Sequence, residues 1–472
     1  MLSPDLLPPC AFPATAFPAS LPVRTTKLRY AILLVTTLAA FLMYLDRMCL
    51  SWIIDSHSFQ ADIDLVPPED DSLKEAFYDA CYWPLPPRFM SWLFSSPKDA
   101  IKEAFFWAYA LAQVPAAWLA ERFGKRYLMA VMILTWSAFT ALTSFADGFA
   151  LLFFARLGCG LAEAGAFPVA SGLLSRWAHF RWRGLASSVV SLGGRLGFVL
   201  APILTAYIIL NSGWRWAGWV YGGGGIMVAL AFWIVFRETP EEHPACNDAE
   251  RAYLAENRTT STSTGPSPFP WRAILTDTSL WLMCAVQFLT NFGWAFLANT
   301  MSSYFKDAHG LSEKVNGQIS TLALLIGMFG LIAGGFLTDF CTRVLGVRLG
   351  RLLPIVCSRF LAGILFLCCL FTNDLTTIVI LFGVMAFTSD AGLPAMWAWS
   401  QDVGGRRVAS VLGWANMWGN FGAALQARSV GYVVRDWDTN HDFHEGFYLS
   451  AGAFLLAGVL ALGINAAKPV EK

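Results

Sequence analysis

The chain has 472 residues, of which 56% are hydrophobic and only 14% are charged. Its formal net charge is zero, so the overall charge indicates neither a nucleic-acid partner nor a strongly acidic one. The apolar residues occur in runs of about 20, the length that a helix needs to cross a hydrocarbon core of roughly 30 Å. This composition excludes an ordinary soluble domain and predicts an all-α membrane protein.

Cysteine and histidine usage indicates neither disulfides nor a metal. Most of the ten cysteines lie in apolar runs, where cysteine acts as a small hydrophobe, and only Cys81 falls in a clearly external loop. Cys368 and Cys369 are adjacent rather than spaced as metal ligands are, and the six histidines do not cluster with them. We therefore expect no loop disulfide, no metal and no cofactor.

The hydrophobic pattern predicts twelve membrane-spanning helices. The first six are expected at 30–53, 101–120, 127–145, 148–173, 184–210 and 214–236. The other six are expected at 279–305, 316–338, 352–371, 375–400, 408–434 and 447–466. Lysine and arginine gather in one set of the loops between them, including Arg122, Lys125, Arg176 and Arg406, whereas the opposite set is acidic. Because basic loops stay in the cytoplasm, we expect both termini there.

Polar segments divide the chain. Residues 1–29 lack the features of a signal peptide and predict a disordered cytoplasmic tail, or a start codon assigned too early. Residues 237–270 are rich in Glu, Pro, Ser and Thr and predict a cytoplasmic linker with a short helix near 247–257. Two six-helix bundles, 30–236 and 271–466, and a cytoplasmic tail, 467–472, complete the division. Paired six-span halves are the layout of transporters that bind substrate at the midplane.

An unusually long external segment, 54–100, follows the first span. It contains several acids and then PLPPRFMSWLF from Pro84 to Phe94. One interpretation is a tolerated surface insertion, since loops accept added length at small cost. The other is an amphipathic piece that lies on the outer leaflet or covers the external mouth.

The fourth span carries two charges on one face. Arg156 and Glu163 are seven residues apart, about two helical turns, so both side chains leave the same side of the helix. Gly158 and Gly160 between them allow a neighbouring helix to come close. A charge at bilayer depth costs roughly 2.5–3.5 kcal/mol on insertion scales, and such residues normally mark a pathway. We interpret this stretch as the centre of a site.

The first span adds a second acid and a second arginine, Asp46 and Arg47, within MYLDRMCL. A carboxyl group that is both desolvated and close to an arginine can change its protonation near physiological pH, so Asp46 and Glu163 are the candidates for proton coupling. Arginine binds planar carboxylates through two parallel hydrogen bonds, which makes Arg47 and Arg156 candidates for an anionic substrate. Structural ion pairs between helices are the alternative.

Other polar residues in the spans are weaker candidates. Arg195 lies in SLGGRLGFVLAP, where a structural pairing and ligand contact are equally plausible, and Tyr109 and Gln113 form a stripe that either lines a cavity or joins helices. Amide donors and an indole edge suit a hydroxylated ligand, although packing is at least as good an explanation for the indole. These groups are Asn291, Trp397, Asn416 and Asn420. We expect Arg359 and Arg428, nearer span ends, to reach the interface instead.

Two predicted cytoplasmic turns have similar sequences. WLAERFGKR follows the second span and GGFLTDFCTR follows the eighth, and in each an acid precedes basic residues. The candidates for a conformational gate are Glu121, Arg122, Arg126 and Asp339.

Four stretches resemble a known family of carriers. YLDR in span one, FFWAYALAQVPAAWLAERFGKR through span two, RLGCGLAEAGAFP in span four and GWRWAGW before span six resemble the major facilitator superfamily. Within it they are similar to the anion:cation symporters, which include galactonate, glucarate and hexuronate permeases, the sialic-acid carrier sialin and the vesicular glutamate carriers. The similarity runs from about residue 28 to residue 466.

The resemblance implies proton-driven uptake of an organic anion by alternating access. It implies that Asp46 and Glu163 titrate, that Arg47 binds the substrate carboxylate and that Arg156 partners the span-four acid. It also places Tyr44, Tyr109, Trp397 and Asn420 in the cavity lining. Two departures stand out: Glu121 replaces the usual aspartate, and Gly194 stands where galactonate permeases have a sugar-binding glutamine. The second departure argues against galactonate itself.

We therefore expect a monomeric, multi-pass proton symporter in a bacterial inner membrane, with a sugar acid such as a hexuronate or aldonate as substrate. Its partners are the small anion, protons and the lipid bilayer, and the proton gradient supplies the energy. An anion exchanger or uniporter for another carboxylate or a phosphate ester is the alternative. An enzyme is not expected, because no GxSxG or HExxH occurs. A nutrient sensor that does not transport is a further alternative, and a sensor of this architecture would be expected to carry a large signalling tail.

Overall fold

The computed structural model describes residues 25–54, 56–66, 71–82, 84–94, 96–255, 271–436 and 443–470. Most of the predicted N-terminal tail, the linker residues 256–270 and residues 471 and 472 lie outside these ranges, as does the side chain of Arg428.

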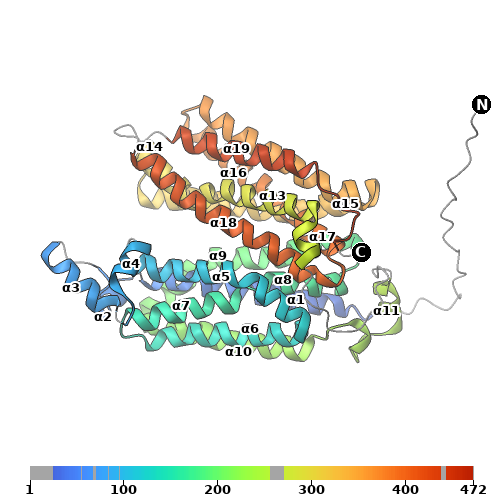
Figure 1. Ribbon diagram of the computed structural model, residues 1–472, viewed down its shortest axis with the longest axis horizontal. Helices are drawn as coiled ribbons and strands as arrows, with labels where there is room; N and C mark the ends of the chain where they lie inside the picture. Colours follow the sequence, from blue (N-terminus) through green and yellow to red (C-terminus); the bar gives the residue numbers. More distant parts are fainter. Residues whose placement is uncertain are drawn as a thin grey trace, which may run out of the picture.

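The first group of long helices forms the lower half of the molecule in Figure 1. Its members pack mainly against one another, and the most extensive contacts join α1 to α9 and α6 to α10. They are α1 (Leu28–Ile54), α5 (Pro97–Phe123), α6 (Lys125–Leu142), α7 (Phe149–Glu163), α8 (Ala166–Trp177), α9 (Arg183–Ser212) and α10 (Trp214–Val235).

The second group forms the upper half in Figure 1. It comprises α13 (Thr278–Ala295), α14 (Met301–His309), α15 (Glu313–Cys368), α16 (Leu375–Ala391), α17 (Leu393–Val403), α18 (Val408–Asp436) and α19 (His444–Ala461). The chain reverses inside α15 at Gly346, whose φ of 78° lies in the left-handed region that favours glycine. A five-residue π-helix, η4 (Phe296–Thr300), joins α13 to α14.

Each of the twelve predicted spans is largely helical, although some of them are divided between consecutive helices. Among the described residues, nine helical segments are long and apolar enough to cross a membrane, and one of them, Val315–Phe371, contains two predicted spans. Helices α5 and α18 contain the remaining two. The shorter elements are η1 (Thr143–Phe145), η2 (Phe180–Trp182), η3 (Pro240–Glu242), α11 (Asp248–Ala255), α12 (Trp271–Thr276), η5 (Cys369–Phe371) and η6 (Gly405–Arg407).

Two spans are broken at corresponding places. Helix α7 ends at Glu163 and α8 begins at Ala166, and likewise α16 ends at Ala391 and α17 begins at Leu393. Pro168 and Pro394 follow these breaks, and a proline removes a helical hydrogen bond and crowds the carbonyl four residues earlier. Each break therefore places an acidic residue near the end of a helix within the membrane.

The long external segment is folded onto one end of the first group, which we call the insertion end. It forms α2 (His57–Asp62), α3 (Asp71–Tyr82) and α4 (Pro87–Leu93), and Phe59 and Tyr82 are fully buried against α1, α7 and α10. The indole of Trp214 donates a hydrogen bond of 2.9 Å to Asp62, and Arg215 forms an ion pair with the same carboxylate. These contacts hold the pKa of Asp62 below its usual range, so this carboxylate stays ionised. The segment is thus a packed cap rather than a loose loop.

The opposite end, beside α11, is called the linker end. Glu250 of α11 accepts hydrogen bonds from the main-chain nitrogens of Leu28 and Arg29 at the start of α1, and from the hydroxyl of Thr26. A carboxylate is favourable there because the first N–H groups of a helix lack partners inside the helix. The nine cysteines among the described residues are all free.

Candidate functional site

A buried ion pair joins the first and fourth spans. The Nε and Nη2 atoms of Arg47 lie 3.3 and 3.0 Å from Oε2 of Glu163, and both residues are almost inaccessible. The guanidinium lies over the rings of Tyr44, Phe105 and Tyr109 at 4.8, 4.8 and 4.5 Å. Oε1 of Glu163 has no hydrogen-bond partner among the described residues. Arg47 is therefore held through one carboxylate oxygen inside an aromatic cage.

Arg156 makes its hydrogen bonds to the backbone of the first span. Its Nη2 donates to the main-chain oxygen of Arg47 at 2.5 Å, its Nη1 donates to that of Asp46 at 3.5 Å, and it stacks on Phe105. The ion pair of Glu163 is instead with Arg47. Arg156 thus fixes the backbone of the first span, because its long side chain reaches carbonyls on the neighbouring helix.

Asp46 is the buried acid of the first span. It is 1% exposed, and neither carboxylate oxygen has a hydrogen-bond partner among the described residues. Buried polar atoms are nearly always paired, so an unpaired carboxyl group calls for an explanation in function. A group that takes up and releases a proton is one such explanation.

The aromatic and amide candidates of the first group extend from this pair. Gln113, one turn from Tyr109 on α5, is fully buried and neither amide atom has a partner among the described residues. Tyr44 packs edge-on against Phe167 at 5.9 Å, and Phe167 packs against Trp397 of the second group at 5.1 Å. Trp397 therefore joins the site by packing.

Arg195 forms an ion pair that crosses between the two groups. Its Nη2 lies 2.8 Å from Oδ1 of Asp390 on α16, and its guanidinium lies 4.5 Å from the ring centroid of Trp294 on α13. The side chains are 15% and 8% exposed. Sequence reasoning missed Asp390, although DAGLP, which begins with this aspartate, resembles EAGAFP, which begins with Glu163. That repeat is the signal that could have found it.

The expectation for Arg359 is wrong. Rather than reaching the interface, Arg359 is fully buried and donates to the main-chain oxygen of Ser389 at 2.8 Å. The helix break after Ala391 places this oxygen within its reach, and sequence distance from the span end did not reveal that neighbour. Arg359 also acts electrostatically on Asp390.

The three asparagine candidates lie on α13 and α18 of the second group. Asn420 donates to the main-chain oxygen of Asn416 at 2.8 Å along α18. Asn291 lies against Gly419, where an added Cβ would come 2.6 Å from its amide nitrogen. Asn291 is one turn from Trp294 and so shares its helix face with the ring that covers Arg195.

Two of the four gate candidates connect the groups at the linker end. Glu121 of α5 accepts from the main-chain nitrogen of Ser410 at 2.9 Å and from its hydroxyl at 2.6 Å, near the start of α18. Asp339 of α15 accepts from the nitrogens of Gly184 and Leu185 at 2.9 and 2.8 Å, at the start of α9. Each acid thus caps a helix of the other group, where the helix dipole favours a negative charge.

The other two gate candidates do not cross between the groups. Arg122 is exposed and stacks on Trp118 of its own helix. Arg126 donates to the main-chain oxygen of Trp233 at 2.6 Å and lies over that ring, within the first group.

Sequence reasoning also missed an acid at the linker end. Asp402 accepts from Arg183 of the first group at 2.5 Å and from Arg351 of its own group at 2.7 Å. Gln401 beside it donates to the hydroxyls of Ser171 and Ser187, both at 3.1 Å. The described contacts therefore tie the two groups together firmly at the linker end, where Figure 1 shows α18 approaching the first group.

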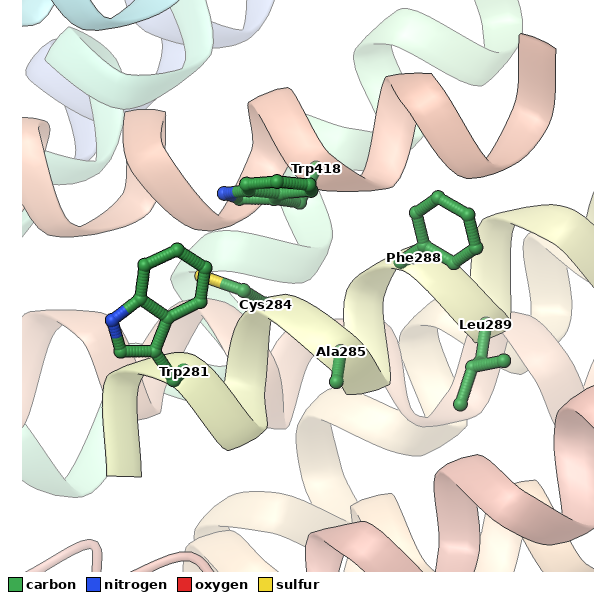
Figure 2. Close-up of a pocket in the computed structure, with 6 residues that line it drawn as sticks. All are labelled: Trp281, Cys284, Ala285, Phe288, Leu289 and Trp418. Atoms are coloured by element: carbon green, nitrogen blue, oxygen red, sulfur yellow. The ribbon is translucent and has the colours of Figure 1, made fainter. Parts of the chain in front are cut away.

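An apolar pocket of about 330 Å³ lies elsewhere, between α13 and α18. Figure 2 shows its lining of Trp281, Cys284, Ala285, Phe288, Leu289 and Trp418. This lining carries no charged group that could bind an anion, so the pocket is not the candidate site.

These features define a multi-pass membrane carrier: two helix groups, charged residues between them at depth, and a set of contacts closing one end. Residues 36–425 match the family described as Major Facilitator Superfamily. The chain belongs to this superfamily.

Curated relatives of the chain are named as transporters rather than enzymes. The probable sulfoacetate transporter SauU of Cupriavidus necator is 28% identical over 375 residues, covering 78% of this chain and 85% of that protein. The probable galactarate/D-glucarate transporter GarP of Escherichia coli is 27% identical over 381 residues, with coverages of 77% and 84%. The probable L-galactonate transporter of Escherichia coli is 24% identical over 375 residues, with coverages of 79% and 81%.

Solved structures share the fold. The human organic anion transporter MFSD10 superposes with a TM-score of 0.66 at 18% identity, covering 92% of this chain and 99% of that chain. The proton:xylose symporter XylE superposes with a TM-score of 0.67 at 14% identity, with coverages of 92% and 95%. The predicted fold class, an all-α membrane protein of the major facilitator type, is confirmed.

Proposed function

We propose that this chain carries an organic anion, a sugar acid such as a hexuronate or aldonate, into a bacterial cell in symport with protons. The observation that carries the proposal is the pair between Arg47 and Glu163. A substrate carboxylate and Glu163 would compete for the same guanidinium, so protonation of Glu163 would free Arg47 for the substrate. The names of the curated relatives, among them galactarate/D-glucarate and L-galactonate transporters, support the same substrate class.

In the proposed cycle the linker end faces the cytoplasm, together with both termini, and the inner membrane surrounds a monomer. The described structure then corresponds to the state closed toward the cytoplasm. Protons reach Asp46 and Glu163 from outside, and the anion binds Arg47. The helix-capping hydrogen bonds of Glu121 and Asp339 then break, and the protons and the anion are released into the cytoplasm. Binding energy that differs between the two states drives the exchange between them.

Gly194 bears on which sugar acid is carried. An added Cβ at this position would lie 2.8 Å from the ring of Tyr44, so a glutamine fits here only if that ring moves. Tyr44 in turn covers Arg47. The proposed substrate is therefore bound by a site that lacks the sugar-binding glutamine of galactonate permeases.

The proposal is tested by thermal-shift measurements on the purified full chain. The panel is glucuronate, galacturonate, galactonate, gluconate, galactarate and glucarate, with glucose and galactose as neutral controls. A ligand that binds only the folded state raises its stability by mass action. Stabilisation by a sugar acid but not by its neutral parent is the expected result, whereas stabilisation by no sugar acid would overturn the assignment.

A further inference from the structure

Trp136 of α6 is fully buried, and its indole N–H has no hydrogen-bond partner among the described residues. A buried tryptophan normally donates this hydrogen, because an indole N–H that loses water without gaining an acceptor is destabilising. Asp46 is also buried, and neither of its carboxyl oxygens has a partner among the described residues. The first group therefore contains an unused buried donor and an unused buried acceptor.

Helix α7 holds these two residues at neighbouring positions. Nη1 of Arg156 donates to the main-chain oxygen of Asp46 at 3.5 Å, and Sγ of Cys159 donates to that of Trp136 at 3.6 Å. Arg156 and Cys159 are three residues apart, so they leave the same face of α7 at levels that differ by roughly 4.5 Å. The backbone of α1 at Asp46 and that of α6 at Trp136 are therefore fixed side by side against one helix face.

A second set of contacts joins the same parts of α1 and α6. Leu42 lies one turn before Asp46 on α1, and Ser137 follows Trp136 on α6. An added Cβ on Gly225 of α10 would lie 1.7 Å from Oγ of Ser137 and 3.3 Å from Cδ2 of Leu42. Within this junction of helices the indole of Trp136 interacts with the Asp46 carboxyl as a donor, without completing a hydrogen bond in this structure.

Two charged groups of α7 lie near the same carboxyl but are engaged elsewhere. Glu163 and Arg156 act on Asp46 electrostatically. Oε2 of Glu163 binds Arg47, and both Nη atoms of Arg156 donate to main-chain oxygens of α1. The Nε atom of Arg156 has no partner among the described residues and is thus a rival donor to Trp136.

The neutral titratable groups around Asp46 are engaged as well. The hydroxyl of Tyr221 on α10 lies 2.8 Å from a threonine hydroxyl of α9. The thiol of Cys49 donates to the main-chain oxygen of Asp46 at 3.2 Å, and the thiol of Cys159 donates to α6. Among these described neighbours, the indole of Trp136 is the neutral donor that remains available to the carboxyl.

The two protonation states of Asp46 need different neighbours. A protonated carboxyl group is neutral and tolerates apolar surroundings, whereas an ionised one is costly at this depth unless a donor binds it. An indole N–H can only donate, so it stabilises the ionised form and cannot accept the proton of the neutral form.

We propose that Trp136 donates a hydrogen bond to Asp46 when that acid releases its proton, and so acts as a positioning residue that sets the pH range of proton coupling. This inference rests on the proposed function and names a residue that regulates the same site. A short rotation of the Asp46 side chain toward the indole completes the hydrogen bond, and protonation of Asp46 breaks it.

Infrared difference spectroscopy of the purified full chain tests this contact without any substrate. The C=O stretch of protonated carboxyl groups is followed as the pH changes, and the band that is lost in Asp46→Asn belongs to Asp46. Trp136→Phe keeps an aromatic ring but removes the donor. The midpoint of the Asp46 titration is expected to rise in this variant by about one to two pH units, the effect of one hydrogen bond to a charged group.

Trp399→Phe is the matched control. Trp399 lies on α17 of the second group, is likewise buried and has no partner for its indole N–H among the described residues. Its substitution removes the same atoms from a different place and should leave the Asp46 midpoint unchanged. The pH at which proton-driven uptake into liposomes is half-maximal should rise in Trp136→Phe and stay constant in Trp399→Phe.

Several outcomes overturn the inference. An unchanged midpoint in Trp136→Phe assigns the ionised acid to another donor such as Nε of Arg156, and an equal shift in Trp399→Phe makes the effect a general one. A shifted midpoint with an unchanged uptake profile separates the hydrogen bond from coupling, and the absence of any titrating Asp46 band removes its basis. The proposed sugar-acid function survives the first three of these results.

Two further measurements keep the test decisive. If no sugar acid is taken up, the proposed function and the coupling role fail together, and the infrared titration still decides whether the hydrogen bond forms. Should Trp136→Phe not purify as a folded protein, 3-benzothienylalanine is incorporated at position 136, because it keeps the shape of the indole and replaces only the N–H by sulfur. An unchanged midpoint in that protein contradicts the inference.

Discussion

Replacing Glu163 by glutamine tests the competition at Arg47. The substitution keeps the shape of the side chain but leaves Arg47, 7% exposed, without its ion-pair partner. Leaving one partner of a buried pair alone costs about 3–5 kcal/mol, and contacts with three aromatic faces offset roughly 0.5–1 kcal/mol each. A net cost of about 2 kcal/mol remains, and an anion bound to Arg47 would recover it. We therefore expect Glu163→Gln to melt at a lower temperature and to bind the substrate at least about tenfold more tightly.

The pH dependence of binding gives the sharper assay for this variant. In wild type the ionised Glu163 reclaims Arg47, so the dissociation constant is expected to rise by up to about tenfold per pH unit once Glu163 has lost its proton. In Glu163→Gln this competition is absent and only Asp46 is left to take up a proton, so the dependence on pH should be clearly weaker. Titration calorimetry of both proteins measures this. The same pH slope in both proteins would show that Glu163 does not compete with the substrate for Arg47.

Three further predictions concern Arg47, Asp46 and the buried Phe59 of the cap. Arg47→Lys keeps the charge but loses the two-pronged donor, and the substrate dissociation constant should rise about tenfold or more; an unchanged constant would place the carboxylate elsewhere. Asp46→Asn should abolish pH-driven accumulation while exchange of labelled for unlabelled substrate continues, and full accumulation would exclude Asp46 from coupling. Phe59→Ala, at a fully buried position of the cap, should cost about 3–5 kcal/mol and lower the melting temperature, whereas a solvent-exposed cap would show no change.

The sequence was sufficient to predict the helices and the depth of the principal charges. Apolar runs of membrane length leave little choice of structure, because backbone groups in lipid must bond within a helix. An arginine or acid inside such a run is costly wherever it points, and this singled out Arg47, Arg156 and Glu163. The spacing of glycines in the fourth span was also informative, since an added Cβ on Gly160 would lie 2.4 Å from the main-chain oxygen of Phe105.

The pairing of these charges could not be predicted, because it depends on which helices become neighbours. Arg156 and Glu163 share a helix face, yet Glu163 pairs with Arg47 on another span. Arg359 looked close enough to a span end to reach the interface, but it is buried and donates to the main-chain oxygen of Ser389, just before the break after Ala391. Similarly, Asp402 follows an apolar run in an ordinary turn sequence, and only the packed arrangement shows that it joins the two helix groups.

Proton-driven uptake into liposomes distinguishes symport from exchange. The purified chain is reconstituted with a labelled sugar acid outside and an inwardly directed proton gradient, and the internal concentration is compared with the external one. We expect accumulation above equilibrium that collapses when a protonophore dissipates the gradient. Exchange of labelled for unlabelled acid without any gradient-driven accumulation would contradict symport and identify the protein as an exchanger or uniporter.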